Sequence, residues 1–165
     1  MWHRIAVVAL ALSASAARAQ PVRAGALAPE IDLPTLTGGR LQLSKLRGHP
    51  VVVSFWGTWC PPCRAEFPAL VKASLEHSSS GPQVVAVNGR DQETSDKNVK
   101  KFVDEFSVTF QVALDQRGRA RRAFLIQGLP TTVFIDSSGV VRGVHRGPIS
   151  SEELARGLAT ILTMK

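Results

Sequence analysis

The 165-residue sequence predicts an α/β fold in which helices flank a mixed β-sheet. Two nearly continuous apolar runs, at residues 51–56 and 84–88, are typical of strands that are buried on both faces. A segment with helical spacing separates these runs, and strands joined through helices favour parallel pairing. A hairpin signal close to the C-terminal end adds antiparallel strands at one side of the sheet.

A hairpin is also predicted ahead of the first buried strand. Residues 31–33 and 41–43 alternate apolar and polar side chains, and residues 37–39 between them are Thr-Gly-Gly, which favours a turn. Residues 20–29 are rich in Pro, Ala and Gly, and we expect them to form a poorly ordered lead-in.

The first long helix is predicted to follow the strand at 51–56, running from Cys63 to about His77. Pro68 lies inside it and removes one helix hydrogen bond, which should bend the helix. The apolar face expected for this helix consists of Phe67, Leu70, Val71, Ser74 and Leu75.

A second helix is predicted after the strand at 84–88, with Thr94 and Ser95 as its cap. Its apolar residues fall at i, i+3, i+4 and i+7, and they are Val99, Phe102, Val103 and Phe106. Residues 110–114 are then a candidate short strand, and residues 117–125 are expected to form a short basic helix.

The C-terminal part of the chain predicts a hairpin and one more helix. Residues 131–136 and 140–145 flank Ser-Ser-Gly, a good turn signal. Ser150 and Glu153 then have the spacing of a capping box. The helix that they open has four apolar residues on one side: Leu154, Leu158, Ile161 and Leu162.

The first twenty residues have the pattern of an export signal. Residues 1–4 are short and basic, residues 5–17 are apolar and small, and Ala17-Arg18-Ala19 fits the rule for signal peptidase. The apolar stretch is shorter than the ~20 residues that a spanning helix needs, so an uncleaved membrane anchor is the alternative. We therefore expect a signal peptide at 1–19, one domain at 20–165, and a periplasmic protein.

The chain is basic, with a formal net charge of +7 that falls to +5 when residues 1–19 are removed. No aromatic stripe is interleaved with the basic residues, so nucleic-acid binding is not expected. A solvated basic face is the first interpretation, and attraction to an anionic membrane surface or an acidic partner is the alternative. Much of the excess lies at Arg90, Lys97, Lys100, Lys101, Arg117, Arg119, Arg121 and Arg122.

Cys60 and Cys63 are the only cysteines, and they lie where the first buried strand ends and a helix begins. The free N–H groups and the dipole of a helix N-terminus stabilise a thiolate. A disulfide that closes so small a loop contributes little as a static bridge. A structural zinc site needs four ligands, and the three remaining histidines beyond the leader stand alone, so no metal is expected. A redox-active dithiol is the leading hypothesis.

The stretch 55–68, which contains Trp-Cys-Pro-Pro-Cys, resembles the active-site region of extracytoplasmic thioredoxin-like proteins of the TlpA/ResA type. Residues 25–31 and 43–48 are similar to that family's N-terminal extension. Residues 96–106 are similar to its central insertion, and residues 128–136 to its cis-proline segment. The resemblance implies a thioredoxin fold with an N-terminal β-hairpin extension and a central strand–helix insertion.

Three residues are the candidates for the chemistry. Cys60, expected to be the more exposed cysteine, would attack a partner's disulfide, and Cys63 would resolve the mixed disulfide. Glu66 lies three residues after Cys63, on the same helix face. Thioredoxins carry a buried aspartate six residues before the first cysteine, where this chain has Ser54. The resemblance therefore implies that Glu66 accepts the Cys63 proton instead.

Five further residues are candidates for substrate binding. The resemblance implies a cis peptide bond at Pro130, with the Leu129 backbone presented to an extended substrate as an added strand. Trp59 would form an exposed apolar lip beside the first cysteine. Pro61 and Pro62 stiffen the motif and offer no N–H to its sulfur.

The resemblance also implies a function. Such proteins usually reduce disulfides in exported proteins, as in cytochrome c maturation or the delivery of copper to an oxidase. We expect a monomer that acts on an exported protein with a Cys pair, takes electrons from a membrane thiol carrier, and needs no cofactor besides the Cys60–Cys63 disulfide. The alternatives are an oxidant that introduces disulfides, a thiol peroxidase, and a copper-handling binding module.

Overall fold

The computed structural model describes residues 22–76 and 81–163. The predicted signal peptide at 1–19 lies outside the described residues. No helix within the described ranges is long and apolar enough to cross a membrane.

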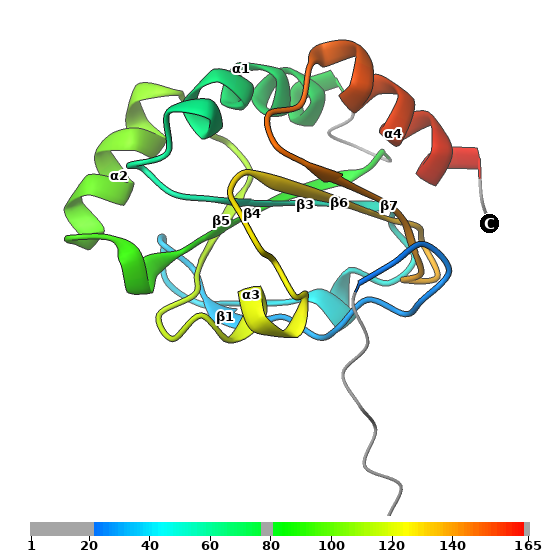
Figure 1. The fold of residues 1–165 in the computed structure, drawn as a ribbon, viewed down its shortest axis with the longest axis horizontal. Helices are drawn as coiled ribbons and strands as arrows, with labels where there is room; N and C mark the ends of the chain where they lie inside the picture. The colour runs from blue at the N-terminus through cyan, green and yellow to red at the C-terminus, as the bar shows by residue number, and fades with distance from the viewer. Residues whose placement is uncertain (1–21, 77–80, 164–165) are drawn as a thin grey trace, which may run out of the picture.

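A five-stranded mixed sheet lies at the centre of the molecule (Figure 1). Strand β3 (Val51–Trp56) is in the middle, pairing parallel with β4 (Gln83–Asn88) and antiparallel with β6 (Thr131–Ile135). The edges are β5 (Gln111–Leu114), parallel to β4, and β7 (Val141–Arg146), antiparallel to β6. The predicted mixed α/β sheet is therefore confirmed.

Two layers cover the two faces of this sheet (Figure 1). The helices α1 (Pro61–Glu76), α2 (Asp96–Glu105) and α4 (Ser151–Thr163) lie on one side. On the other side lie α3 (Arg119–Ala123) and a separate antiparallel pair, formed by β1 (Asp32–Pro34) and β2 (Arg40–Gln42). Two short 3₁₀ helices, η1 (Leu43–Leu46) and η2 (Arg90–Gln92), follow β2 and β4.

Strand β3 is buried along its whole length because successive side chains point to opposite faces, and both faces are covered. Val52 and Trp56 belong to the apolar cluster under α1, α2 and α4. Val53 and Phe55 belong to the second cluster, which includes residues of β1, β2 and α3. The N-terminal hairpin therefore packs on the central sheet, and the two share one hydrophobic core.

The predicted helix caps are confirmed. The Asn98 N–H donates to the Ser95 hydroxyl at 3.3 Å, which caps α2. At α4, the Ser150 N–H donates to the Glu153 carboxylate at 2.9 Å and the Glu153 N–H donates to the Ser150 hydroxyl at 3.2 Å. These reciprocal bonds are the expected capping box.

The predicted start and buried face of α1 need correction. The helix begins at Pro61, two residues before the expected start, because proline fits the first helical position, where its missing N–H is not needed. Leu75, which we expected in the apolar face, is 58% exposed. The side chains that α1 buries are Cys63, Glu66, Phe67, Leu70 and Ala73. The hydrophobic pattern assigned Glu66 to the surface, whereas the buried side of α1 contains its carboxyl group.

Candidate functional site

The two cysteines form a disulfide with an S–S distance of 2.05 Å, just beyond the end of β3. Cys60 occupies the cap position of α1: its carbonyl accepts from the Arg64 N–H at 3.3 Å. Its sulfur accepts from the Cys63 N–H, also at 3.3 Å. Pro61 and Pro62 have no N–H, so Cys63 supplies the first N–H of the helix. The same donor is in place to stabilise a Cys60 thiolate once the disulfide opens.

Cys60 is 3% exposed and Cys63 is fully buried. The order of exposure is the predicted one, although both sulfurs lie below the surface in the disulfide form. Pro61 and Pro62 are exposed above them, and Trp59 is 51% exposed. Trp and Pro side chains therefore form an exposed apolar rim next to the buried cysteines.

Trp59 lies against Gly57, at the start of the loop that leads to the cysteines. A Cβ atom added to Gly57 would come within 2.9 Å of the Trp59 indole atoms Cε2 and Nε1. That distance is shorter than a nonbonded carbon contact, so glycine gives the indole the room for its present position. This loop thus depends on a residue without a side chain.

A carboxylate from a distant part of the chain holds the middle of this loop. Glu93 accepts from the Thr58 N–H at 2.6 Å and from the Thr58 hydroxyl at 2.5 Å. It also accepts from the Asn88 side-chain amide at 2.9 Å, at the end of β4. Glu93 and Asn88 are not among the site residues that the sequence predicts; the one available signal was a polar Asn at the end of an otherwise apolar strand.

Glu66 is a carboxyl group in the interior, 2% exposed. It accepts two hydrogen bonds, from the Ser54 hydroxyl at 3.1 Å and from the Ile149 N–H at 3.3 Å. Burial raises the pKa of Glu66 to about 7, and the bonds from Ile149 and Ser54 oppose that rise. The carboxyl group can therefore take up or release a proton near neutral pH.

Ser54 and Glu66 are the two residues that sequence analysis compared with the buried aspartate of thioredoxins. The structure brings them together: the serine at the aspartate position donates to the glutamate on the helix. Cys63 and Glu66 are both on the buried side of α1, one turn apart. The predicted carboxyl group is thus in the interior beneath the redox pair, on the helix that begins at that pair.

The Leu129–Pro130 peptide bond is cis, as the resemblance implied. Phe55 pairs with Thr131 in antiparallel register, so Pro130 and Leu129 continue beside the end of β3, where the cysteine loop begins. Pro130 is fixed by the Gly147 N–H, which donates to its carbonyl at 2.9 Å. Among the described residues, none forms a hydrogen bond with the Leu129 N–H or carbonyl. These backbone groups remain free to pair with another chain.

An open groove of about 360 Å³ lies beside the redox loop, between α1 and α2. Across it, Arg64 from α1 pairs with Glu105 from α2, and its guanidinium stacks 5.0 Å from the Phe102 ring centroid. The lining residues are Thr58, Arg64, Asn98, Lys101, Phe102 and Glu105. The groove offers polar and charged contacts next to the apolar rim.

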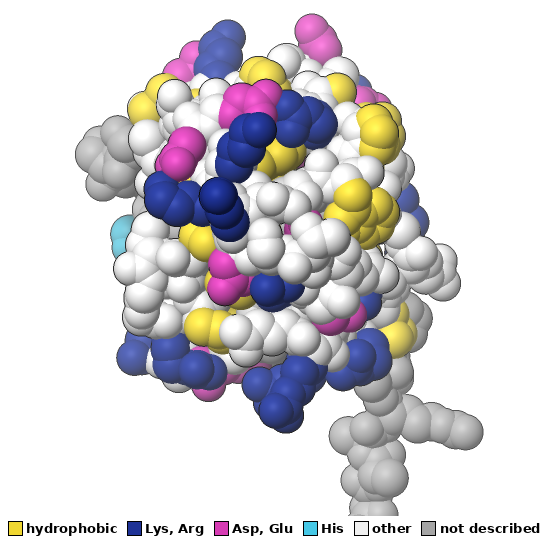
Figure 2. Space-filling view, turned by 90° about the vertical axis from the view of Figure 1, so that its left-hand side faces the viewer, with side chains coloured by type: hydrophobic (Ala, Val, Ile, Leu, Met, Phe, Trp, Pro, Cys, Tyr) yellow, Lys and Arg dark blue, Asp and Glu magenta, His cyan; other side chains and the backbone are white. Residues whose placement is uncertain are grey.

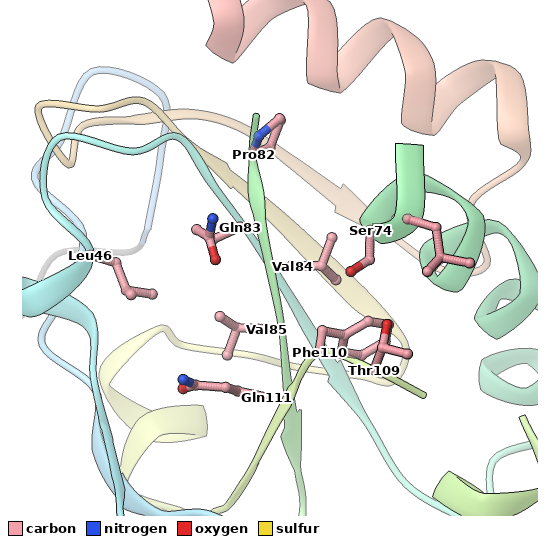
Figure 3. Close-up of a pocket in the computed structure, with 10 residues that line it drawn as sticks. Leu46, Ser74, Pro82, Gln83, Val84, Val85, Thr109, Phe110 and Gln111 are labelled. Carbon is pink, nitrogen blue, oxygen red and sulfur yellow. The ribbon is translucent and has the colours of Figure 1, made fainter. Parts of the chain in front are cut away.

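The pocket drawn in Figure 3 is a different feature, with a volume of about 330 Å³. Gln83 and Gln111, near the starts of β4 and β5, are among its lining residues. Because Gln83 pairs with Val51, the first residue of β3, this pocket lies at the opposite end of the strands from the cysteines. It takes no part in the redox site.

Within residues 22–76 and 81–163, no cluster of three His, Cys, Asp or Glu side chains could hold a metal ion.

Residues 24–144 match the AhpC/TSA family. The chain is 35% identical over 137 residues to the thioredoxin-like protein YneN of Bacillus subtilis, covering 83% of this chain and 79% of YneN. It is 34% identical over 140 residues to the thiol-disulfide oxidoreductase ResA of Geobacillus kaustophilus. The match covers 85% of this chain and 79% of ResA.

A solved structure agrees with these relatives. The crystal structure of a protein assigned as thiol:disulfide interchange protein DsbE from Chlorobium tepidum superposes with a TM-score of 0.77 at 32% identity. The superposition covers 86% of this chain and 99% of the other.

Proposed function

The chain belongs to the AhpC/TSA family and is a thiol–disulfide oxidoreductase with the thioredoxin fold, and from this we propose that it reduces disulfides in exported proteins. The observation that carries the proposal is the Cys60–Cys63 pair at the N-terminus of α1, with the Cys63 N–H directed at the Cys60 sulfur. A thiolate formed there is stabilised, so the pair is suited to exchange rather than to a static bridge. We further propose that the protein needs no redox cofactor besides the Cys60–Cys63 disulfide.

The proposed reaction begins with the dithiol form. The Cys60 thiolate attacks one sulfur of a substrate disulfide, which breaks that S–S bond and forms a bond between Cys60 and the substrate. The displaced substrate sulfur leaves as a thiolate and takes up a proton. Cys63 then loses its proton and attacks the Cys60 sulfur, which closes the Cys60–Cys63 disulfide and releases the second substrate thiol. Two electrons pass to the substrate, and a membrane thiol carrier restores the dithiol.

Glu66 is proposed as the proton acceptor for Cys63 in the resolving step. Its place one turn along the buried side of α1 supports this role, as does a pKa raised to about 7 by burial. A general base is most effective when its pKa is close to the working pH. Ser54 and the Ile149 N–H hold the carboxylate that takes the proton.

Substrate binding is proposed along the Leu129–Pro130 segment. The unbonded Leu129 backbone groups support the addition of an extended substrate chain as a further strand. Trp59, Pro61 and Pro62 would contact apolar side chains that flank the substrate cysteine. Such contacts would orient the substrate disulfide toward the Cys60 sulfur.

We place this chemistry in the periplasm, with residues 1–19 as the signal peptide and 20–165 as the thioredoxin-like domain. The export pattern of the first twenty residues supports the location. The substrates proposed are proteins with a Cys pair, as in cytochrome c maturation or the delivery of copper to an oxidase. The similarity to ResA supports thiol–disulfide exchange, and the reductive direction is the usual one of the TlpA/ResA-type proteins that the active-site stretch resembles.

Trapping of the mixed disulfide tests the proposal. The Cys63→Ala variant keeps the attacking sulfur but lacks the resolving one, so it should accumulate disulfide-linked complexes with exported proteins. The matched Cys60→Ala variant should accumulate far fewer. Non-reducing gels followed by mass spectrometry would identify the captured proteins. Equal capture by both variants, or none by either, would contradict the proposed attack order.

The direction of electron flow is tested separately by the reduction potential against glutathione. A reductant should have a potential well below that of the strong periplasmic oxidants, which lies at about −120 mV. A value close to −120 mV would instead assign the protein to the insertion of disulfides, through the same two cysteines.

A further inference from the structure

The segment around α3 carries four arginines in six residues, 117–122, and no acidic side chain. Arg121 is paired with Asp91 at 2.8 Å. The nearby Asp115 is buried, and its carboxylate accepts from the backbone N–H groups of Arg119 and Arg121. Of the remaining arginines, Arg117, Arg119 and Arg122 are exposed, and none forms an ion pair with another described residue.

The charges in this segment are unfavourable to one another. Arg119 and Arg122 lie three residues apart on a helix, a spacing at which like charges repel. Figure 2 shows Lys and Arg side chains gathered along the lower edge of the molecule, the level at which Figure 1 places α3. The nearby carboxylates Asp91 and Asp32 are already paired with Arg121 and Arg40, although Asp32 also attracts Arg119. The excess of positive charge that remains is suited to a negatively charged surface.

An exposed leucine completes the segment. Leu125 is 39% exposed and has a φ of 50°, the left-handed region. Its N–H donates to the Arg122 carbonyl at 3.0 Å, and the Ile126 N–H donates to the Arg121 carbonyl at 2.9 Å. This is the hydrogen-bond pattern of a Schellman motif, in which glycine usually occupies the left-handed position. The chain here has a large apolar side chain at a strained position, three residues after the exposed Arg122.

We propose that Arg117, Arg119, Arg122 and Leu125 form a surface that binds an anionic phospholipid bilayer. Arginine and leucine together match the membrane interface, where headgroups carry the negative charge and the upper acyl region is apolar. The proposal goes beyond the redox function and does not depend on it. Three cations near an anionic surface predict a roughly 100-fold preference for anionic over neutral vesicles.

The position of this surface in the fold is compatible with catalysis. Ala120 and Phe124 of the α3 segment are buried in the cluster that also contains Val22, the first described residue. Cys60 and Cys63 belong to the cluster on the other side of the sheet. A bilayer in contact with the α3 side would therefore leave the helix side of the molecule, with α1, uncovered (Figure 1).

Vesicle binding of the complete protein tests the proposal. Co-sedimentation would be compared for vesicles of phosphatidylcholine alone and of phosphatidylcholine mixed with phosphatidylglycerol. The combined variant Arg117→Gln, Arg119→Gln and Arg122→Gln should lose most of the preference for anionic vesicles. The matched control combines Lys72→Gln, Lys97→Gln and Lys100→Gln. It removes the same amount of charge from α1 and α2, and it should retain the preference for anionic vesicles. All variants have the same N-terminal segment, so its contribution cancels in the comparison.

The Leu125→Gly variant separates the apolar contact from folding. Glycine adopts the φ of this position without strain, so the variant should fold at least as well as the wild type. Its binding to the mixed vesicles should fall several-fold. Equal binding of the arginine variant and the wild type would overturn the proposal. An equal loss in the lysine control would also overturn it, because net charge rather than this surface would then explain the binding.

Discussion

At the scale of single residues, Glu66 is the group whose properties differ most from those of a free side chain. An exposed glutamate titrates near 4.5, whereas burial raises the pKa of Glu66 to about 7. The folded protein therefore holds a proton that the unfolded chain has already lost at intermediate pH. A group with this behaviour links the stability of the fold to pH.

The raised pKa of Glu66 makes the stability of the folded protein decrease as the pH rises. Between about pH 4.5 and pH 7 the folded state binds more protons at Glu66, so its contribution makes stability fall as the pH rises and level off above 7. The full loss corresponds to about 3 kcal/mol. The Glu66→Gln variant, whose amide can still bond to Ser54 and the Ile149 N–H, should lack this loss. Urea unfolding of the oxidised protein at pH 5 and pH 8 measures it.

Glu152→Gln is the matched control, since Glu152 is an exposed glutamate in the first turn of α4. The free energy of unfolding of this variant should differ between pH 5 and pH 8 by as much as that of the wild type. If Glu66→Gln loses as much stability between pH 5 and pH 8 as the wild type does, the carboxyl group is not the source of the linkage.

Cys60, Cys63 and Glu66 were recognisable because their spacing is local, within two turns of one helix. Glu93 was not, because it contacts Thr58, 35 residues away in the chain. The contact forms only when the fold brings Glu93, which follows η2, next to the loop after β3. No periodicity in the sequence predicts that these two segments are neighbours.

At the scale of elements, strands and caps were predictable and helix faces were less so. Buried strands are runs of apolar residues, so β3 and β4 were found within one residue of their ends. Helix α1 misled the prediction because its buried side includes Glu66, a charged residue that a hydrophobic pattern assigns to the surface. The buried carboxyl group of Glu66 is therefore the reason why the predicted face differs from the observed one.

The packing of α4 on the sheet gives an element-scale prediction. A Cβ atom added to Gly157 would lie 2.2 Å from the Cζ atom of Phe134. Phe134 belongs to β6, and its side chain is only 5% exposed. Alanine normally stabilises a helix relative to glycine by about 1 kcal/mol. Gly157→Ala should nevertheless destabilise the protein by about 1–3 kcal/mol, because α4 or the phenyl ring must move. Urea unfolding measures the change.

A change on the exposed side of the same helix is the control. Ala159→Gly should lower stability by about 1 kcal/mol through helix propensity alone, since Ala159 is exposed. A gain in stability in Gly157→Ala would show that α4 does not approach β6 as closely as the structure has it.

At the scale of the whole molecule, the N-terminal hairpin is part of one folding unit. Leu33 and Leu41 of β1 and β2 are buried in the same cluster as Val53 and Phe55 of the central strand. The Leu36 N–H donates to the Val112 carbonyl at 2.9 Å, which ties the hairpin to the edge strand β5. The sequence predicted the hairpin but not this docking, because alternation shows that a strand has an apolar face without showing what covers it.

The last prediction follows from that shared core. Leu41 is 2% exposed, so Leu41→Ala should cost about 2–5 kcal/mol, as for other buried leucines. The loss should appear as one shifted urea transition, seen equally by circular dichroism and by tryptophan fluorescence, to which buried Trp56 of the other cluster contributes. Leu27→Ala, at a 67% exposed leucine of the same N-terminal region, should change stability by less than about 0.5 kcal/mol. A second, separate transition in Leu41→Ala would mean that the hairpin folds independently of the sheet that carries the redox site.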